Sequence, residues 1–519
     1  MTERPATDLR LVPAAIGAWA ACIVAVAFGW VSALVLAMVC VVGAGVAATL
    51  RRRGRAPAVA LVLLTALGVT AGFAVAASLR LHSVTTGPVR EGAERGSSAT
   101  VVGVVTDDPR RITGSFADQV VVPVRAHRVT LRGQVVDGSA RITVFGAPDG
   151  WIDLEPGAAV TFRAILAVPD RVGAVDAVAR ATGPPDAGQP SAALRWSGRI
   201  RAALADASET ALPAEEAGLL PGMVVGDRSG LVPAVEDSFA AAGMSHLTAV
   251  SGANFTFLVG SVVLLARLLT VGPRTTAVVA GIVLVAFVVV ARPSPSVLRA
   301  AVMGVLGLLA VMTGRRRHVM PALCTAVLLL LAVDPALAVS WGFALSVTAT
   351  AALVVVAPVI TQFLAGTGPD DEPRRRPVLD AVAVALAAHV VTAPLVAAMV
   401  GTFSLYSVIA NVVAAPVVGP VTVVGALAAV VAVVNVDAGA VVAGVAWLPL
   451  RWLVNVAAWT ASVPGSSVST PTGPAGAVVV GVAIAAGLAA AVLIRRIASG
   501  RRLTSGDRSL SGRHGTIDR

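Results

Sequence analysis

The sequence predicts a polytopic α-helical membrane protein with about twelve spans and a small extracellular β-barrel domain inserted after the third span. Of its 519 residues, 56% are hydrophobic and only 13% are charged, and the mean hydropathy is +0.84. A soluble domain is about one quarter charged, so this composition excludes a water-soluble enzyme, and the apolar content excludes low-complexity disorder. The formal charge of +11 does not indicate a soluble nucleic-acid-binding protein, because basic residues of membrane proteins mostly set topology.

The first domain, residues 1–80, is predicted to hold three transmembrane helices. Residues 11–50 are apolar and are interrupted at Gly29-Trp30, which divides them into two helices, and a third apolar run covers 56–79. A cleavable signal peptide is a poor fit, because the apolar stretch is too long and further runs follow it closely. The positive-inside rule places Arg4, Arg10 and the basic cluster at 51–55 in the cytoplasm, so the chain emerges outside after the third span.

A β-domain is predicted over 96–183, because short β-branched runs alternate there with turn residues. The expected strands cover 99–106, 119–126, 140–145 and 158–166. The expected turns are at Asp107-Asp108-Pro109, Asp137-Gly138, Asp149-Gly150 and Pro156-Gly157. Four or five strands of this length predict a small barrel, of which the OB-fold is one candidate, or a small sandwich. Residues 182–190 form the expected exit linker.

Residues 184–246 are predicted to be a linker with amphipathic, interfacial helices. Over 191–217, Arg195, Arg199 and Arg201 alternate with apolar residues at helical spacing. This pattern is typical of a helix that lies on the membrane surface and holds its arginines at the lipid headgroups.

The main transmembrane domain is predicted over 247–494, with about nine further spans. They are expected at 247–268, 275–291, 297–313, 319–334, 338–361, 378–400, 405–434, 439–460 and 474–494. The 405–434 run contains Pro416 and Pro420 and is expected to be broken or re-entrant. With this count the basic clusters at 315–318, 374–376 and 495–496 all fall on the cytoplasmic side of the cell membrane. Residues 495–519 are a basic cytoplasmic tail that would contact anionic lipid or nucleic acid.

Polar residues inside apolar helices are costly, and they usually face a cavity or a partner. Three groups stand out, and the first comprises His246, Thr248, Ser251 and Asn254, with Gly252 allowing close approach of another backbone. The second is Arg292 and Arg299, with Pro295 at the first turn of a helix; the two arginines would form an electropositive mouth or would reach phospholipid phosphates. The third is more diffuse and includes Ser346 and Asn411.

No catalytic or cofactor motif accompanies these groups. His246 and Ser251 could form a hydrolase pair, but the sequence lacks a Gly-x-Ser-x-Gly elbow, a His-Glu-x-x-His motif and a Walker A loop. Cys22, Cys40 and Cys324 are too few and too scattered for a disulfide scaffold or a metal site. We expect no cofactor, no metal ion and no enzymatic activity.

The polar groups lie within stretches that closely resemble the signature of the ComEC/Rec2 family of DNA-uptake channel proteins. The central match is Leu220-Pro-Gly-Met-Val-Val-Gly-Asp-Arg228 followed by Gly243-Met-Ser-His-Leu-Thr-Ala-Val-Ser-Gly-Ala-Asn254. Further matching stretches are Pro295-Ser-Val-Leu-Arg-Ala-Ala-Val-Met303, Asp334-Pro335, Gly342-Phe-Ala-Leu-Ser346, Thr392-Ala-Pro394, Phe403-Ser404, Ala410-Asn411 and Pro416. The N-terminal spans and the small β-domain, which is OB-like in this family, also fit its layout.

This resemblance implies a membrane channel for single-stranded DNA during natural transformation. It implies that His246, Ser251, Gly252 and Asn254 line the path, with Arg299 near its mouth. Further residues expected along the path are Thr248, Arg292, Ser346 and Asn411. The residues expected to be structural are Gly222, Gly226, Asp227, Arg228, Pro295 and Pro394. Asp227 would pair with Arg228 or cap a helix. The implied partners are single-stranded DNA, membrane lipids, a DNA receptor, a separate nuclease and a cytoplasmic helicase or ATPase.

Two alternatives and one departure accompany the resemblance. The same fold could transport another anionic or lipid-linked substrate, or Ser251 and His246 could form an intramembrane hydrolase. Many relatives carry a C-terminal metallo-β-lactamase-like domain with a His-x-His-x-Asp-His metal cluster. This sequence reaches Arg519 without that cluster, so no nuclease activity is expected.

Overall fold

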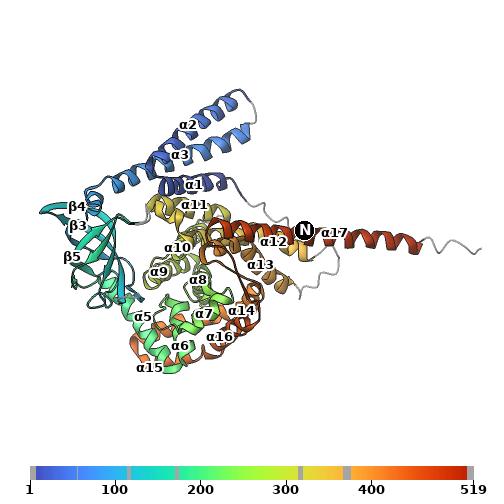
Figure 1. The fold of residues 1–519 in the computed structure, drawn as a ribbon. Helices are drawn as coiled ribbons and strands as arrows, with labels where there is room; N and C mark the ends of the chain where they lie inside the picture. The colour runs from blue at the N-terminus through green and yellow to red at the C-terminus, as the bar shows by residue number, and fades with distance from the viewer. Residues whose placement is uncertain are drawn as a thin grey trace, which may run out of the picture.

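The computed structural model describes residues 8–54, 57–113, 118–169, 175–313, 319–365 and 376–510. Most of the described residues form helices, and one small sheet domain follows the first long helices along the chain (Figure 1). In Figure 1 the sheet domain lies at one side of the helical block, and a pair of N-terminal helices projects away from that block.

The N-terminal part consists of α1 (Val12–Phe28), α2 (Trp30–Arg52), α3 (Pro57–Thr85) and the short α4 (Pro88–Glu94). The predicted break at Gly29 is confirmed: this residue has a φ of 90° and separates α1 from α2. Glycine adopts such a conformation readily because it has no Cβ. Val35, Met38 and Val42 of α2 are exposed, as expected for a helix that faces lipid.

The sheet domain contains seven strands, of which five form a ring of pairings. The path runs β1-β3-β4-β6-β5, and β5 pairs with β1 again; β4 and β6 are parallel, and the other pairs are antiparallel. Trp151 and alternate strand residues such as Val144 and Leu166 are fully buried between them. The strands are β1 (Ser98–Val105), β2 (Arg110–Thr113), β3 (Asp118–Leu131), β4 (Gln134–Gly146), β5 (Ala159–Ala167), β6 (Ala177–Ala181) and β7 (Asp186–Ala187).

Two local predictions in this domain are wrong. Asp137-Gly138 does not form a turn but lies within β4, where Asp137 pairs with Arg128 of β3. The chain turns instead at Arg132 and Gly133, whose φ angles of 48° and 85° are the two positive values that a type I′ hairpin turn requires. The expected exit linker contains β7, which pairs with β5.

Three helices and a 3₁₀ turn connect the sheet domain to the main helical block: α5 (Ala192–Ala211), α6 (Ala214–Val225), α7 (Pro233–Ala241) and η1 (Ser245–Leu247). The expected interfacial helix is α5, and its Arg195 and Arg199 are exposed. Arg201 contradicts that expectation, because it is only 5% exposed. It is buried because α5 packs against α6, α9 (Pro273–Ala291), α14 (Ser407–Val434) and α15 (Val436–Gly444).

The remaining helices form the main block. They are α8 (Gly252–Leu268), α9 (Pro273–Ala291), α10 (Pro295–Met312), α11 (Val319–Val333), η2 (Pro335–Val339), α12 (Trp341–Ala365), α13 (Arg376–Val400), α14 (Ser407–Val434), α15 (Val436–Gly444), α16 (Trp447–Ser462) and α17 (Pro474–Leu510), with β8 (Thr402–Ser404) paired to β9 (Ser467–Ser469). As predicted, Pro295 is the first residue of its helix, a position where its missing N–H costs nothing.

Multiple apolar helices identify a multi-pass membrane protein, but the predicted count of about twelve spans is not confirmed. Over the described residues, 7 helices are long and apolar enough to cross a membrane, or up to 8 if a bent pair forms one span. The helices α1, α8, α10 and α11 are apolar but shorter. The basic residues at 315–318 and 374–375 lie outside the described residues, as does 511–519, so the orientation inferred from them stays a prediction.

The predicted break in the 405–434 run is also wrong. Pro416 and Pro420 lie inside α14, which continues for 28 residues, since neighbouring groups in a helix bundle can satisfy the carbonyls that proline leaves free. The break occurs in the next predicted span, where α15 and α16 meet at a bend of 56°.

The largest apolar core surrounds α6. Leu219, Leu220 and Met223 of this helix are at most 1% exposed, and they pack with buried residues of α14 and α16. The segment predicted as a linker therefore contributes the helix around which the main block packs.

Candidate functional site

The first polar group lies where η1 leads into α8, beside the end of α6. Asn254 of α8 is 3% exposed, and its amide nitrogen donates to the carbonyl oxygen of Met223 in α6 at 2.5 Å. The Ser251 hydroxyl donates to the Asn254 side-chain oxygen at 2.9 Å. Thr248 is 1% exposed and donates to the carbonyl of Ser245. Asn254 therefore holds the start of α8 against α6, whereas the hydrogen bonds of Ser251 and Thr248 are local.

His246 differs from these residues because its side chain is exposed. The surrounding chain nevertheless desolvates the imidazole and lowers the pKa of His246, which favours the neutral ring. Within the described residues, no hydrogen bond joins His246 to Ser251, whose hydroxyl is directed to Asn254 instead. The pair thus lacks the contact that a serine nucleophile and its base require.

Two glycines of the central motif permit the tight packing at this junction. A Cβ on Gly222 would lie 2.8 Å from the carbonyl oxygen of Thr248, so no larger residue fits without backbone movement. Gly226 ends α6 with a φ of 75°, a left-handed conformation that glycine adopts most readily. Both residues position the loop that follows α6.

Arg299 lies one turn into α10 and is 7% exposed. Its Nε donates to the Ser346 hydroxyl of α12 at 2.7 Å, and a terminal nitrogen lies 3.5 Å from the sulfur of Met303. A Cβ on Gly252 would lie 2.8 Å from the other terminal nitrogen. The guanidinium therefore lies among α8, α10 and α12 and does not extend to lipid headgroups. Among the described residues, no carboxylate lies within 4.0 Å of it.

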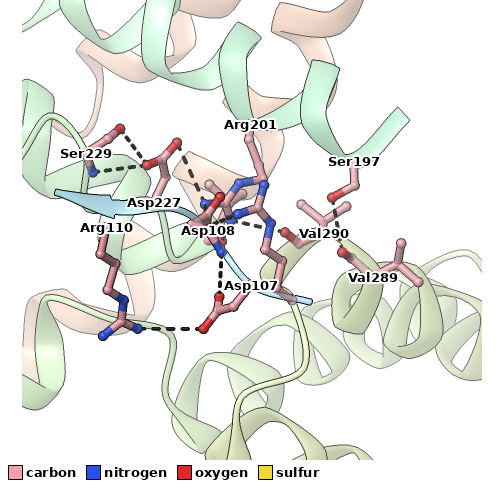
Figure 2. A network of polar contacts seen from close by, with 11 residues as sticks. Asp107, Asp108, Arg110, Ser197, Arg201, Asp227, Ser229, Val289 and Val290 are labelled. Atoms are coloured by element: carbon pink, nitrogen blue, oxygen red, sulfur yellow. Dashed lines mark hydrogen bonds and ion pairs between the residues drawn. The ribbon is translucent and has the colours of Figure 1, made fainter. Parts of the chain in front are cut away.

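Arg292, in the turn between α9 and α10, belongs to a second group of charges. Its guanidinium forms an ion pair with Asp108, which lies in the loop between β1 and β2. Arg201 of α5 reaches the same carboxylate oxygen at 3.8 Å. Figure 2 shows the side chain of Arg201 extending from α5 toward Asp108 and Asp227. The sheet domain and the helical block therefore meet at a pair of arginines.

Arg201 is held by contacts from three segments besides that loop. Its guanidinium donates to the carbonyl oxygens of Val225 and Val290 and lies 3.8 Å from Asp227. Burial lowers the pKa of Arg201, while Asp227 and Asp107 raise it. Burial also lowers the pKa of Arg292, and Asp107 raises it. Both groups stay protonated because the guanidinium is not deprotonated in proteins.

The predicted pairing of Asp227 with Arg228 is wrong. Asp227 accepts hydrogen bonds from the backbone N–H and the hydroxyl of Ser229 and contacts Arg201. Arg228 pairs instead with Glu236 of α7.

Arg292 also has an unusual backbone, with φ of 62° and ψ of 150°. A side chain with a Cβ rarely adopts this region, and such strain typically persists where the surrounding structure fixes a functional residue. The strained backbone and the charge of Arg292 are therefore two independent indications that this turn has a functional role.

The other predicted residues do not join these groups. The Asn411 amide donates to the backbone and hydroxyl oxygens of Ser407, on its own helix. Pro394 lies inside α13. Among the described residues, no group of three or more His, Cys, Asp or Glu side chains could hold a metal ion.

Sequence reasoning missed Arg201 and Asp108. The helical spacing predicts an exposed position for Arg201, and Asp107-Asp108-Pro109 predicts only a turn. One signal was available, since two adjacent carboxylates in a loop of an otherwise basic protein can serve as partners for arginines.

Comparison with known proteins supplies one result. The family model described as "Competence protein" matches residues 223–496, which is more than half of the chain. The match begins within α6 and includes α8, Arg292, Arg299 and Ser346. No curated protein and no solved structure matches the chain.

Proposed function

The chain belongs to the competence protein family, and we propose that it is a membrane channel that imports single-stranded DNA during natural transformation. In this proposal the protein lies in the cytoplasmic membrane with both termini in the cytoplasm, and the sheet domain lies outside. The proposal assigns transport to this chain and assigns it no nuclease activity.

The observation that carries the proposal is the buried guanidinium of Arg299. An isolated charge inside a membrane protein is expensive and usually faces a partner or an aqueous pathway. Arg299 has a hydroxyl and a thioether as its described neighbours and no described carboxylate within 4.0 Å. A DNA phosphate passing between α8, α10 and α12 would supply the missing negative charge.

Two further features support the same function. The ring of five strands is compatible with a small OB-like barrel, a module that offers single strands a groove. The side chain of His246 is exposed, as a side chain on an aqueous path would be. We therefore place His246, Ser251, Gly252 and Arg299 along the proposed path, with Thr248 and Asn254 behind them.

The partners proposed for this channel follow from its task. Single-stranded DNA is the cargo, and membrane lipids surround the helices. A separate DNA receptor would deliver the duplex, a separate nuclease would leave one strand, and a cytoplasmic helicase or ATPase would draw that strand inward.

The test replaces Arg299 by Gln in a transformable host and measures uptake of labelled DNA into the cytosol. We expect uptake to fall by about tenfold or more, the factor that a loss of ~1.4 kcal/mol in phosphate binding produces. The matched control is Arg274→Gln, which removes the same charge from an exposed position at the start of α9. Unchanged uptake after deletion of the whole gene would reject the DNA channel.

A transporter of another anionic or lipid-linked substrate is the second candidate, because Arg299 would attract any anion. Purified protein in liposomes, given fluorescent oligonucleotides, small anions and labelled lipids in parallel, separates the two. Selective movement of the oligonucleotide supports the DNA channel. The hydrolase alternative has no such support, since Ser251 donates to Asn254 and not to His246.

A further inference from the structure

The meeting point of the sheet domain and the helical block contains more than a structural ion pair. Two arginines from different elements converge on one oxygen of Asp108, and their side chains are 6% and 19% exposed for Arg201 and Arg292. The Asp108 side chain is 48% exposed. The two guanidinium groups are thus largely buried, whereas the Asp108 carboxylate lies on a loop and is much more exposed.

The charges at this point balance only while Asp108 is in place. Arg201 has a second carboxylate neighbour, Asp227 at 3.8 Å. For Arg292, Asp108 is the one carboxylate within 4.0 Å among the described residues. Withdrawal of the loop would leave one buried positive charge uncompensated, and a buried guanidinium strongly favours a replacement anion.

A phosphodiester has the properties of such a replacement. It carries one negative charge and two non-bridging oxygens, and guanidinium groups bind phosphate through paired hydrogen bonds. The strained backbone of Arg292 holds its side chain at this point, and Arg299 lies on the helix that begins immediately after the same turn. The two positions would thus present guanidinium groups in succession to a strand entering between the helices.

We propose that Arg201 and Arg292 form a binding site for a backbone phosphate of single-stranded DNA, and that Asp108 occupies this site until a strand displaces it. The inference rests on the proposed function and adds to it an entry site and an internal competitor. Asp107 supports the occupied state, because it accepts the backbone N–H of Asp108 and contacts Arg110 at 3.7 Å. DNA and the loop therefore compete for the same two guanidinium groups.

The test measures binding of a fluorescent single-stranded oligonucleotide to the full-length protein in detergent, by anisotropy at fixed ionic strength. Asp108→Asn removes the competing charge and keeps the side-chain shape, so we expect it to bind about fivefold tighter or more. Arg292→Gln should weaken binding. In the double variant, the gain from Asp108→Asn should disappear, because the two residues act at one site.

Asp137→Asn is the matched control, since it removes a negative charge from the same domain at an exposed pair with Arg128. An equal gain from this variant would show a general effect of net charge and would overturn the proposal. A gain that persists in the Asp108→Asn, Arg292→Gln double variant would also overturn it. If none of the variants binds the oligonucleotide, the proposed phosphate site is also rejected. The channel function is tested separately, by DNA uptake into the cytosol of the host in which the gene is deleted.

Discussion

Gly252 is the residue at which packing and the proposed chemistry meet. It is the first residue of α8, and a Cβ there would lie 2.8 Å from a terminal nitrogen of Arg299. The sequence predicted close approach of another backbone at this glycine, but the neighbour is the end of a side chain. The guanidinium can move, so a methyl group at this position would shift a charge without disrupting the helix.

We predict that Gly252→Ala lowers DNA uptake by about tenfold, corresponding to ~1.4 kcal/mol of weakened phosphate contact, while the protein stays folded. Its free energy of unfolding, measured by thermal unfolding in detergent, should change by less than about 1 kcal/mol, because alanine favours the helix and the displaced guanidinium nitrogen belongs to a flexible side chain. Gly260→Ala in the same helix is the control, since a Cβ there meets nothing within 4 Å. If the Gly252→Ala variant takes up DNA normally, the proposal that Arg299 lines the DNA path is wrong.

At the residue scale, the sequence identified polar side chains but not their contacts. Asn254 and Thr248 were expected to line a passage, yet both are buried, with Asn254 bonded to Met223. Spacing of three residues places side chains on one helix face, but it does not show whether that face meets water or another helix. The partner of Asn254 is a backbone carbonyl, which no side-chain pattern reveals.

At the scale of the element, α6 shows why a short buried helix escapes sequence analysis. It has 12 residues, too few for a span, and its apolar side chains surround the axis so that no amphipathic periodicity marks it. Its burial depends on residues of α14 and α16 far along the chain. The long apolar runs were predictable because lipid imposes their length, whereas the burial of α6 follows from tertiary packing.

Gly218 provides a test of this packing. A Cβ at Gly218 would lie 2.1 Å from the carbonyl oxygen of Gly230, and backbone cannot move aside cheaply. We predict that Gly218→Ala destabilises the protein by about 2 kcal/mol, since overpacking costs up to about 3 kcal/mol and the gain in helix propensity returns about 1 kcal/mol. Thermal unfolding of the detergent-solubilised protein measures the change.

Gly230, which lies on the other side of the same contact, provides the control. A Cβ on Gly230 would meet only the Cα of Gly218, at 3.7 Å, which is an ordinary van der Waals distance. Gly230→Ala should therefore shift stability by less than about 0.5 kcal/mol. Similar melting temperatures for the two variants would mean that α6 and its loop are less tightly packed than these distances require.

At the scale of the whole molecule, the sheet domain contacts the helical block through charges at more than one place. Besides the contact of Asp108, Arg141 of β4 forms two hydrogen bonds to Asp334, at 2.8 Å and 3.0 Å. Composition predicted a separate β-domain at this point of the chain, but it carried no information about how that domain would dock.

The Arg141 contact gives a prediction about the coupling of the two parts. Arg141→Gln removes the charge of the pair but leaves Asp334 to cap η2, whose Ala336 N–H it accepts. The two side chains are 34% and 27% exposed, so solvent screening limits the loss to about 1 kcal/mol. Weaker docking should then increase hydrogen–deuterium exchange at 334–339 and, because the loop that carries Asp108 moves with the domain, at 106–109.

Arg125→Gln is the control, since Arg125 is exposed and lies directly opposite Arg141 in the sheet. If exchange rises at 334–339 alone, the Asp108 contact holds independently, and the domain is attached at two separate points without coupling between them.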